Sequence, residues 1–143
     1  MGVQHIEVYA RSSAPPPAVW RWLADASSWS EWSMLSDTSL ESPGSPTPDG
    51  VGAIRRLGRA GRFSREEVLE FEPPLHLGYR LLSGVPVRDY VAGVYLSADG
   101  GGTLIVWRAR FTAKVPGTGL LIRWFFRRVL AGFARNLARQ AVV

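Results

Sequence analysis

The chain contains no cysteine, two histidines and a single lysine among its 143 residues. Without cysteine it can form no disulfide, use no thiolate nucleophile and offer no sulfur ligand to a metal. The two histidines, His5 and His76, stand far apart, and no His/Asp/Glu spacing around them indicates a metal site. We therefore expect no metal and no other cofactor.

Long apolar runs are missing as well. No stretch approaches the roughly 18–20 apolar residues that a membrane-spanning helix needs, and Arg123 interrupts the most apolar one. The first five residues, MGVQH, are not a basic segment followed by an apolar run, so we expect no signal peptide and a cytoplasmic protein. The sequence also contains no nucleophile elbow and no glycine-rich phosphate loop.

Aromatic side chains are plentiful, with six tryptophans, six phenylalanines and four tyrosines. Hydrophobic residues make up 46% of the chain and charged residues 20%, which is an ordinary globular balance. We expect residues 1–143 to form a single domain that buries about two thirds of its unfolded surface. The aromatic residues of such a domain can fill its core or line a cavity.

The net charge of +5 is concentrated at one end of the chain. Residues 1–116 hold 12 basic and 12 acidic side chains, whereas residues 117–143 hold five arginines and no acid. We expect a solvated helix face, with weak contact to an anionic membrane surface or an acidic partner as the alternative. No motif for nucleic-acid binding accompanies the charge, so we expect no such partner. The arginines of this face are Arg123, Arg127, Arg135 and Arg139.

Residues 118–140 show a clear helical period. On a wheel of 100° per residue, one broad arc is apolar and the opposite arc carries the arginines. An arc with three phenylalanines needs a large partner surface, so we expect Phe125 and Phe133 to be buried. The apolar arc consists of Ile122, Phe125, Phe126, Val129, Leu130, Phe133 and Leu137.

Upstream of this helix, alternating patterns and turn signals predict a strand at residues 3–11, two short helices before residue 33, and six further strands. These strands cover residues 38–41, 51–58, 62–72, 75–83, 87–97 and 103–114. In the last strand the alternation predicts that Ile105, Trp107, Ala109 and Phe111 face inward. Antiparallel strands with one covering helix make an α+β domain. Because one helix cannot fill a curved sheet of about seven strands, we expect a cavity between helix and sheet.

Local motifs follow one another in a fairly specific order. They are Ala14-Pro15-Pro16 with Val19-Trp20, the pair Trp29/Trp32, Gly50-Val51-Gly52, Glu67-Val68 with Glu70, Glu72-Pro73-Pro74 and Tyr79, and Gly102-Thr103 with Trp107. Over almost the whole chain this order resembles the START-like (SRPBCC) superfamily, and within it the polyketide cyclase/dehydrase and lipid-transport type. The resemblance implies a helix-grip fold, in which a curved sheet wraps around a long C-terminal helix. It says little about function, because such folds serve binding proteins, transfer proteins and cyclases.

Glu67 is the candidate acid or base of the chain. Its alternation places it with Leu69 and Phe71 on a face that should be apolar, and burial there would raise its pKa. Two alternatives stay open. A shift of one residue would place Glu66 inside and Glu67 in water, and Glu67 could instead pair with an arginine such as Arg56 or Arg80.

We expect the protein to bind or transfer a small hydrophobic or aromatic molecule of polyketide, lipid, isoprenoid or quinone type. A polyketide cyclase or dehydratase, with Glu67 or Tyr79 moving a proton, is one alternative. An interaction module that docks through the arginine face is another. The pattern does not decide which faces of strands 75–83 and 87–97 point into the cavity. The candidate ligand contacts are Trp32, Glu67, Tyr79, Tyr90, Tyr95, Trp107, Phe125, Val129 and Phe133.

Overall fold

A computed structural model describes residues 2–143 and contains seven strands, three α-helices and one 3₁₀ turn. The N-terminal part comprises β1 (Gln4–Ser12), α1 (Pro16–Ala24), the 3₁₀ turn (Ala26–Ser28), α2 (Trp29–Trp32) and β2 (Asp37–Ser42). The rest comprises β3 (Ile54–Arg59), β4 (Arg62–Glu72), β5 (His76–Ser83), β6 (Val87–Asp99), β7 (Gly102–Ala113) and α3 (Gly119–Gln140).

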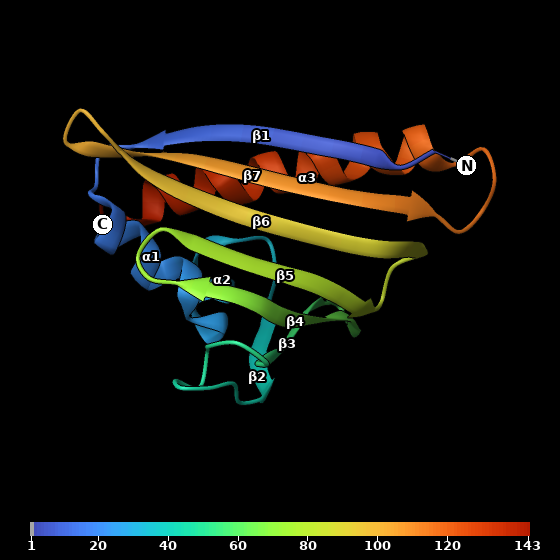
Figure 1. The fold of residues 1–143 in the computed structure, drawn as a ribbon, viewed down its shortest axis with the longest axis horizontal. Coiled ribbons are helices and arrows are strands. Elements are labelled where there is room, and N and C mark those ends of the chain that lie inside the picture. The colour runs from blue at the N-terminus through green and yellow to red at the C-terminus, as the bar shows by residue number, and fades with distance from the viewer. Residues whose placement is uncertain (1) are drawn as a thin grey trace.

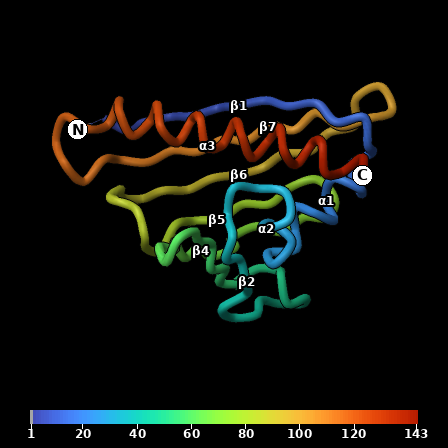
Figure 2. Tube along the Cα trace, turned by 180° about the vertical axis from the view of Figure 1, so that it is seen from behind, coloured from blue at the N-terminus to red at the C-terminus, as the bar shows by residue number. Residues whose placement is uncertain are grey.

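The strands form one antiparallel sheet in the order β1-β7-β6-β5-β4-β3-β2 (Figure 1). The long helix α3 runs along one face of this sheet and packs mainly against β1 and β7, as the view from behind shows (Figure 2). The short helices α1 and α2 contact the same helix. The predicted α+β helix-grip architecture is therefore confirmed.

Local sequence explains why the first helices form where they do. Pro16 opens α1, where its fixed φ suits the first helical turn and its missing N–H costs nothing. Val19, Trp20 and Leu23 then form the buried side of this helix. The carboxylate of Asp25 accepts a hydrogen bond from the Ser27 backbone N–H at 3.1 Å and so starts the 3₁₀ turn.

Strand β7 follows its predicted alternation without interruption. Ile105, Trp107, Ala109 and Phe111 are all buried, while Arg108 on the opposite face is exposed. The inward residues form the centre of the core, beneath α3.

Strand β4 departs from simple alternation, and this overturns the prediction for Glu67. Its pairing with β5 shifts between Val68 and Glu70, as at a β-bulge. An extra residue reverses which side chains face inward. Glu66 and Val68 are therefore buried before the bulge, and Phe71 packs on the core after it. Placing Glu67 on one apolar face with Leu69 and Phe71 was wrong, since Leu69 is exposed at the bulge, and the alternative with Glu66 inside is correct.

Helix α3 is rotated relative to the expected packing. Its buried residues are Leu130, Ala134, Leu137 and Ala138, which face the edge strand β1 and its neighbour β7. Phe133 is half-buried as part of the packing layer, but Phe125 is 52% exposed, so its predicted burial is wrong. The physical reason is that α3 lies over β1 and β7, at one end of the strand order. Part of the apolar arc of α3 therefore has no strand beneath it.

The arginine face of α3 is largely as expected. Arg127, Arg135 and Arg139 are exposed, whereas Arg123 is half-buried and departs from the prediction. Within residues 2–143, no helix combines the length and the apolar character needed to cross a bilayer.

Candidate functional site

A cavity of about 370 Å³ lies between α3 and the strands that α3 does not cover. Helix α3 provides one wall, and β3 to β6 provide the opposite wall. The helix wall consists of Phe125, Phe126, Val129, Leu130 and Phe133. The position of the cavity follows from the packing of α3 on β1 and β7, because a helix at one side of a wide sheet cannot fill the other side.

The sheet wall combines apolar and polar side chains. Leu57 and Leu81 contribute apolar surface, and Glu66, Tyr79 and Tyr90 contribute a carboxyl and two phenol groups. The mouth of the cavity is bordered by the loop after α2, the β3–β4 hairpin and the turn before β6. The residues at this mouth are Met34, Leu35, Arg59, Arg62, Phe63, Gly84 and Val85.

Five of the nine predicted ligand contacts line this cavity, namely Tyr79, Tyr90, Phe125, Val129 and Phe133. Trp32 and Trp107 are buried behind the wall. The Trp107 indole Nε1 donates a hydrogen bond to the Tyr79 hydroxyl at 3.0 Å, so it positions a cavity residue without lining the cavity. The ring of Trp32 packs edge-on against Phe133, with centroids 6.3 Å apart.

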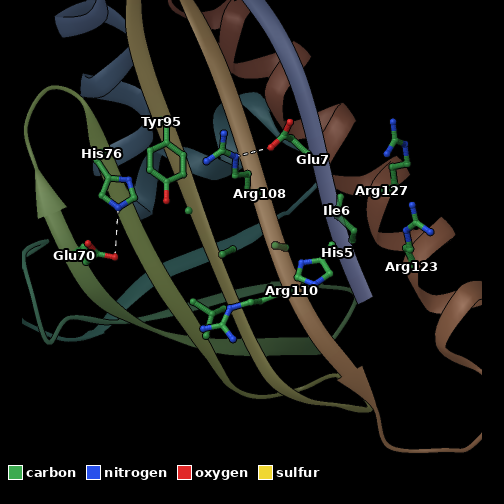
Figure 3. Close-up of a pocket in the computed structure, with 14 residues that line it drawn as sticks. His5, Ile6, Glu7, Glu70, His76, Tyr95, Arg108, Arg110, Arg123 and Arg127 are labelled. Carbon is green, nitrogen blue, oxygen red and sulfur yellow. Dashed lines mark hydrogen bonds and ion pairs between the residues drawn. The ribbon is translucent and has the colours of Figure 1, made fainter. Parts of the chain in front are cut away.

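Tyr95 and Glu67 lie on the opposite face of the sheet, which corrects their predicted place. Tyr95 stacks on His76 with ring centroids 4.3 Å apart, and both belong to an open hollow on the outer face (Figure 3). Tyr90 and Tyr95 are an odd number of residues apart on β6, so they cannot share a face of a regular strand. Glu67 accepts a hydrogen bond from the Arg80 guanidinium at 2.7 Å, as the arginine alternative had it.

The pairing of Arg55 with Glu66 is the main feature that the sequence did not reveal. The two residues are cross-strand partners on β3 and β4, and Arg55 donates a hydrogen bond to Glu66 at 3.1 Å. The Arg55 side chain is fully buried, and its guanidinium lies over the rings of Trp29 and Tyr79 at 4.5 and 5.3 Å. The sequence did contain one indication that Arg55 faces inward. It lies two residues from both Ala53 and Leu57, which are buried, so the alternation of a strand places all three on the same face.

Burial and neighbouring charges shift the pKa values of Glu66, Tyr79 and Tyr90. Burial raises the pKa of the Glu66 carboxyl, and the neighbouring Arg55 cation opposes that rise. Burial also raises the pKa of Tyr79 and Tyr90, with the nearby Glu66 carboxylate adding to the effect. Both phenols therefore stay protonated at neutral pH and can donate hydrogen bonds to a ligand oxygen.

Chemically, the cavity is an apolar chamber with three polar side chains on its sheet side, Glu66, Tyr79 and Tyr90. These side chains can form hydrogen bonds to an oxygen of a guest molecule, and the Glu66 carboxyl can exchange a proton. Among residues 2–143, no cluster of His, Asp and Glu side chains is arranged to hold a metal ion.

Solved structures with similar folds extend over almost the entire chain. The ZhuI aromatase/cyclase from Streptomyces sp. R1128 is 17% identical with a TM-score of 0.81, covering 99% of this chain and 94% of its own. The protein TTHA0849 from Thermus thermophilus is 17% identical with a TM-score of 0.77, covering 97% of each chain. Ara h 8.0201 is 12% identical with a TM-score of 0.75, covering 99% of each chain. At these identities the likeness shows a shared fold.

The sequence comparisons give a second, independent result. No match was found among curated proteins. The family described as polyketide cyclase / dehydrase and lipid transport matches residues 3–142. Both the architecture and this match agree with the motif order in the sequence, and the chain belongs to the polyketide cyclase / dehydrase and lipid transport family.

Proposed function

We propose that the protein binds or transfers a small hydrophobic or aromatic molecule that carries at least one oxygen group. The cavity between α3 and the sheet supports this proposal above all other observations. Its walls are mostly aliphatic and aromatic, and Glu66, Tyr79 and Tyr90 supply its polar contacts. A polyketide, lipid, isoprenoid or quinone has the matching chemistry, with an apolar body and a few oxygens.

The size and shape of the cavity fit one small guest. Its volume of about 370 Å³ falls within the roughly 300–1,000 Å³ that is usual for small-molecule sites. Phe126 and Phe133 offer flat apolar surfaces that suit a ring system or an acyl chain. An interaction module with a filled core would lack such a chamber, so the cavity favours binding over that alternative.

Nile red, a neutral hydrophobic dye, tests the proposal directly. Wild-type protein in its native state should bind the dye and raise its fluorescence, because the cavity walls are mostly apolar. Val129→Phe places a larger side chain inside the cavity and should weaken dye binding at least severalfold. Tyr9→Phe is a suitable control, since Tyr9 is exposed on β1 outside the cavity.

Dye binding that Val129→Phe leaves unchanged would contradict a site in this cavity. Native mass spectrometry of the purified protein complements the dye. A co-purifying small molecule that is lost in Val129→Phe would identify the ligand class.

A second candidate function is a polyketide cyclase or dehydratase. The observation that favours it is the Glu66 carboxyl, which lies in the cavity wall with a raised pKa. A similar structure is described as an aromatase/cyclase, which is compatible with this candidate. We favour binding without turnover, because the Glu66 carboxyl is already engaged by a hydrogen bond from the buried Arg55 guanidinium at 3.1 Å.

Glu66→Gln separates the two functions. For a binding protein, we expect a modest change in Nile red affinity and no turnover of a poly-β-ketone thioester by either protein. For an enzyme, the variant should lose about 10²–10⁴-fold in cyclisation rate while dye binding persists. The matched control is Glu67→Gln, which makes the same chemical change one residue away on the outer face. Turnover by wild type that only Glu66→Gln abolishes would overturn our preference.

A further inference from the structure

Large apolar side chains gather on the solvent side of α3, next to the cavity mouth. Leu121 and Trp124 are 67% and 58% exposed, and Phe125 is exposed while also lining the cavity. Leu121 and Phe125 are four residues apart, so they lie on one side of the helix. Met34 and Phe63 continue this surface across the mouth. We call these residues the mouth patch: Met34, Phe63, Leu121, Trp124 and Phe125.

Positive charge surrounds the mouth patch. Arg128 is exposed on α3 between Leu121 and Trp124 on the helical wheel, and residues 117–143 contain no acid that could neutralise it. The Arg128 guanidinium lies 5.3 Å from the Trp124 ring centroid, so apolar and cationic groups alternate closely. Arg59 and Arg62 are exposed at the opposite border of the mouth.

The combination of exposed apolar side chains with arginines distinguishes between the partners that could cover the mouth patch. A second copy would bring the two α3 helices together with arginines on both sides and no acid on either helix, which is unfavourable. An anionic bilayer offers phosphates to the arginines and an apolar layer to the large side chains. A tryptophan beside arginines also suits the boundary between headgroups and acyl chains. Figure 2 shows that, within residues 2–143, no other element lies over the exposed side of α3.

We propose that the protein docks on anionic membrane surfaces through the mouth patch, with Leu121, Trp124 and Phe125 entering the headgroup–acyl boundary. Arg128, together with Arg59 and Arg62 across the mouth, then contacts lipid phosphates. The bilayer would face the cavity mouth directly, since Phe125 belongs to both the patch and the cavity wall. A hydrophobic guest could pass between the two without crossing water. The docking stands on the surface alone, whereas the passage of a guest rests on the proposed function.

Vesicle co-sedimentation tests the docking. Wild-type protein should bind vesicles of phosphatidylcholine mixed with phosphatidylglycerol, bind pure phosphatidylcholine far more weakly, and lose affinity as salt rises. Arg62→Gln/Arg128→Gln should weaken binding by about tenfold or more, since each arginine near an anionic surface contributes about 1 kcal/mol. Arg135→Gln/Arg139→Gln removes the same charge from the far end of α3 and should lose much less.

The apolar half of the proposal has its own readouts. Leu121→Gln/Trp124→Gln should reduce binding at low salt while thermal unfolding stays unchanged, because both side chains are exposed. Lipids with brominated acyl chains should quench part of the tryptophan fluorescence of bound wild type. Trp124→Phe should bind equally well and lose most of this quenching, since Trp20, Trp29, Trp32 and Trp107 are buried and Trp22 is half-buried on α1, outside the mouth patch.

Several results would overturn the docking proposal. One is absence of binding to anionic vesicles at low salt, and another is equal loss in the two double arginine variants. A third is a concentration-dependent dimer, seen by analytical ultracentrifugation, that Leu121→Gln/Trp124→Gln abolishes without any change in vesicle binding. Nile red binding separates the two proposals. If the dye binds but the protein does not bind vesicles, the docking proposal is wrong and the proposed function stands. If the protein binds vesicles but not the dye, the proposed function is wrong and the docking proposal stands.

Discussion

Arg55→Met is expected to lower the free energy of unfolding by about 3–5 kcal/mol, because it strands the buried Glu66 carboxylate without its cation. The Arg55 side chain has no exposed surface, and Glu66 is only 9% exposed, so the carboxylate would be left largely desolvated without its partner. The variant also loses the contacts between the guanidinium and the rings of Trp29 and Tyr79. Urea unfolding of wild type and variant measures the difference.

A double variant shows whether the loss of stability comes from losing the ion pair or from leaving the Glu66 carboxylate unpaired. Within residues 2–143, the Nε and Nη1 atoms of Arg55 are buried without a hydrogen-bond partner, so the ion pair is imperfectly satisfied. Replacing such a pair by apolar side chains is often neutral or stabilising. We therefore expect Arg55→Met/Glu66→Leu to recover most of the lost stability. An additive loss in the double variant, or a loss below about 1 kcal/mol in Arg55→Met, would contradict a coupled buried pair.

The second large effect concerns α3. Phe133→Ala should cost about 2–3 kcal/mol, somewhat less than a fully buried phenylalanine, because its ring is only half-buried. This ring packs against Trp29, Trp32 and Trp107 with centroids 5.7–6.3 Å apart, so its loss opens a space among three tryptophans.

Phe125→Ala is the matched comparison on the same helix. It should cost under about 1 kcal/mol, since the side chain is more than half exposed. Thermal and urea unfolding of both variants measure the contrast. Equal losses at the two positions would show that α3 does not sit over β1 and β7 as described.

Much of the architecture was predictable because local patterns repeat. The regular alternation in β7 identified Ile105, Trp107 and Phe111 as inward residues, and nothing along that strand interrupts it. The helical period of residues 118–140 predicted α3 with an error of one residue at its start. With about seven strands and one long helix, a cavity was a consequence of geometry.

The site was less predictable, because alternation carries no information across a bulge. One extra residue in β4 exchanges the faces of Glu66 and Glu67, so the inward acid is decided by how β4 pairs with β5. The buried partner of that acid comes from a neighbouring strand. The pairing of Arg55 with Glu66 depends on the register between β3 and β4, which strand patterns alone do not reveal.

The sequence by itself determined the elements, their order, the apolar and basic sides of the last helix, and the family resemblance, since these depend on local spacing. The tertiary structure decided where that helix sits across the sheet, because a wheel gives the direction of an apolar arc and not its lateral position. Packing against β1 and β7 buried Leu130 and Leu137, left Val129 and Phe133 at a cavity, and exposed Leu121 and Trp124 beside its mouth.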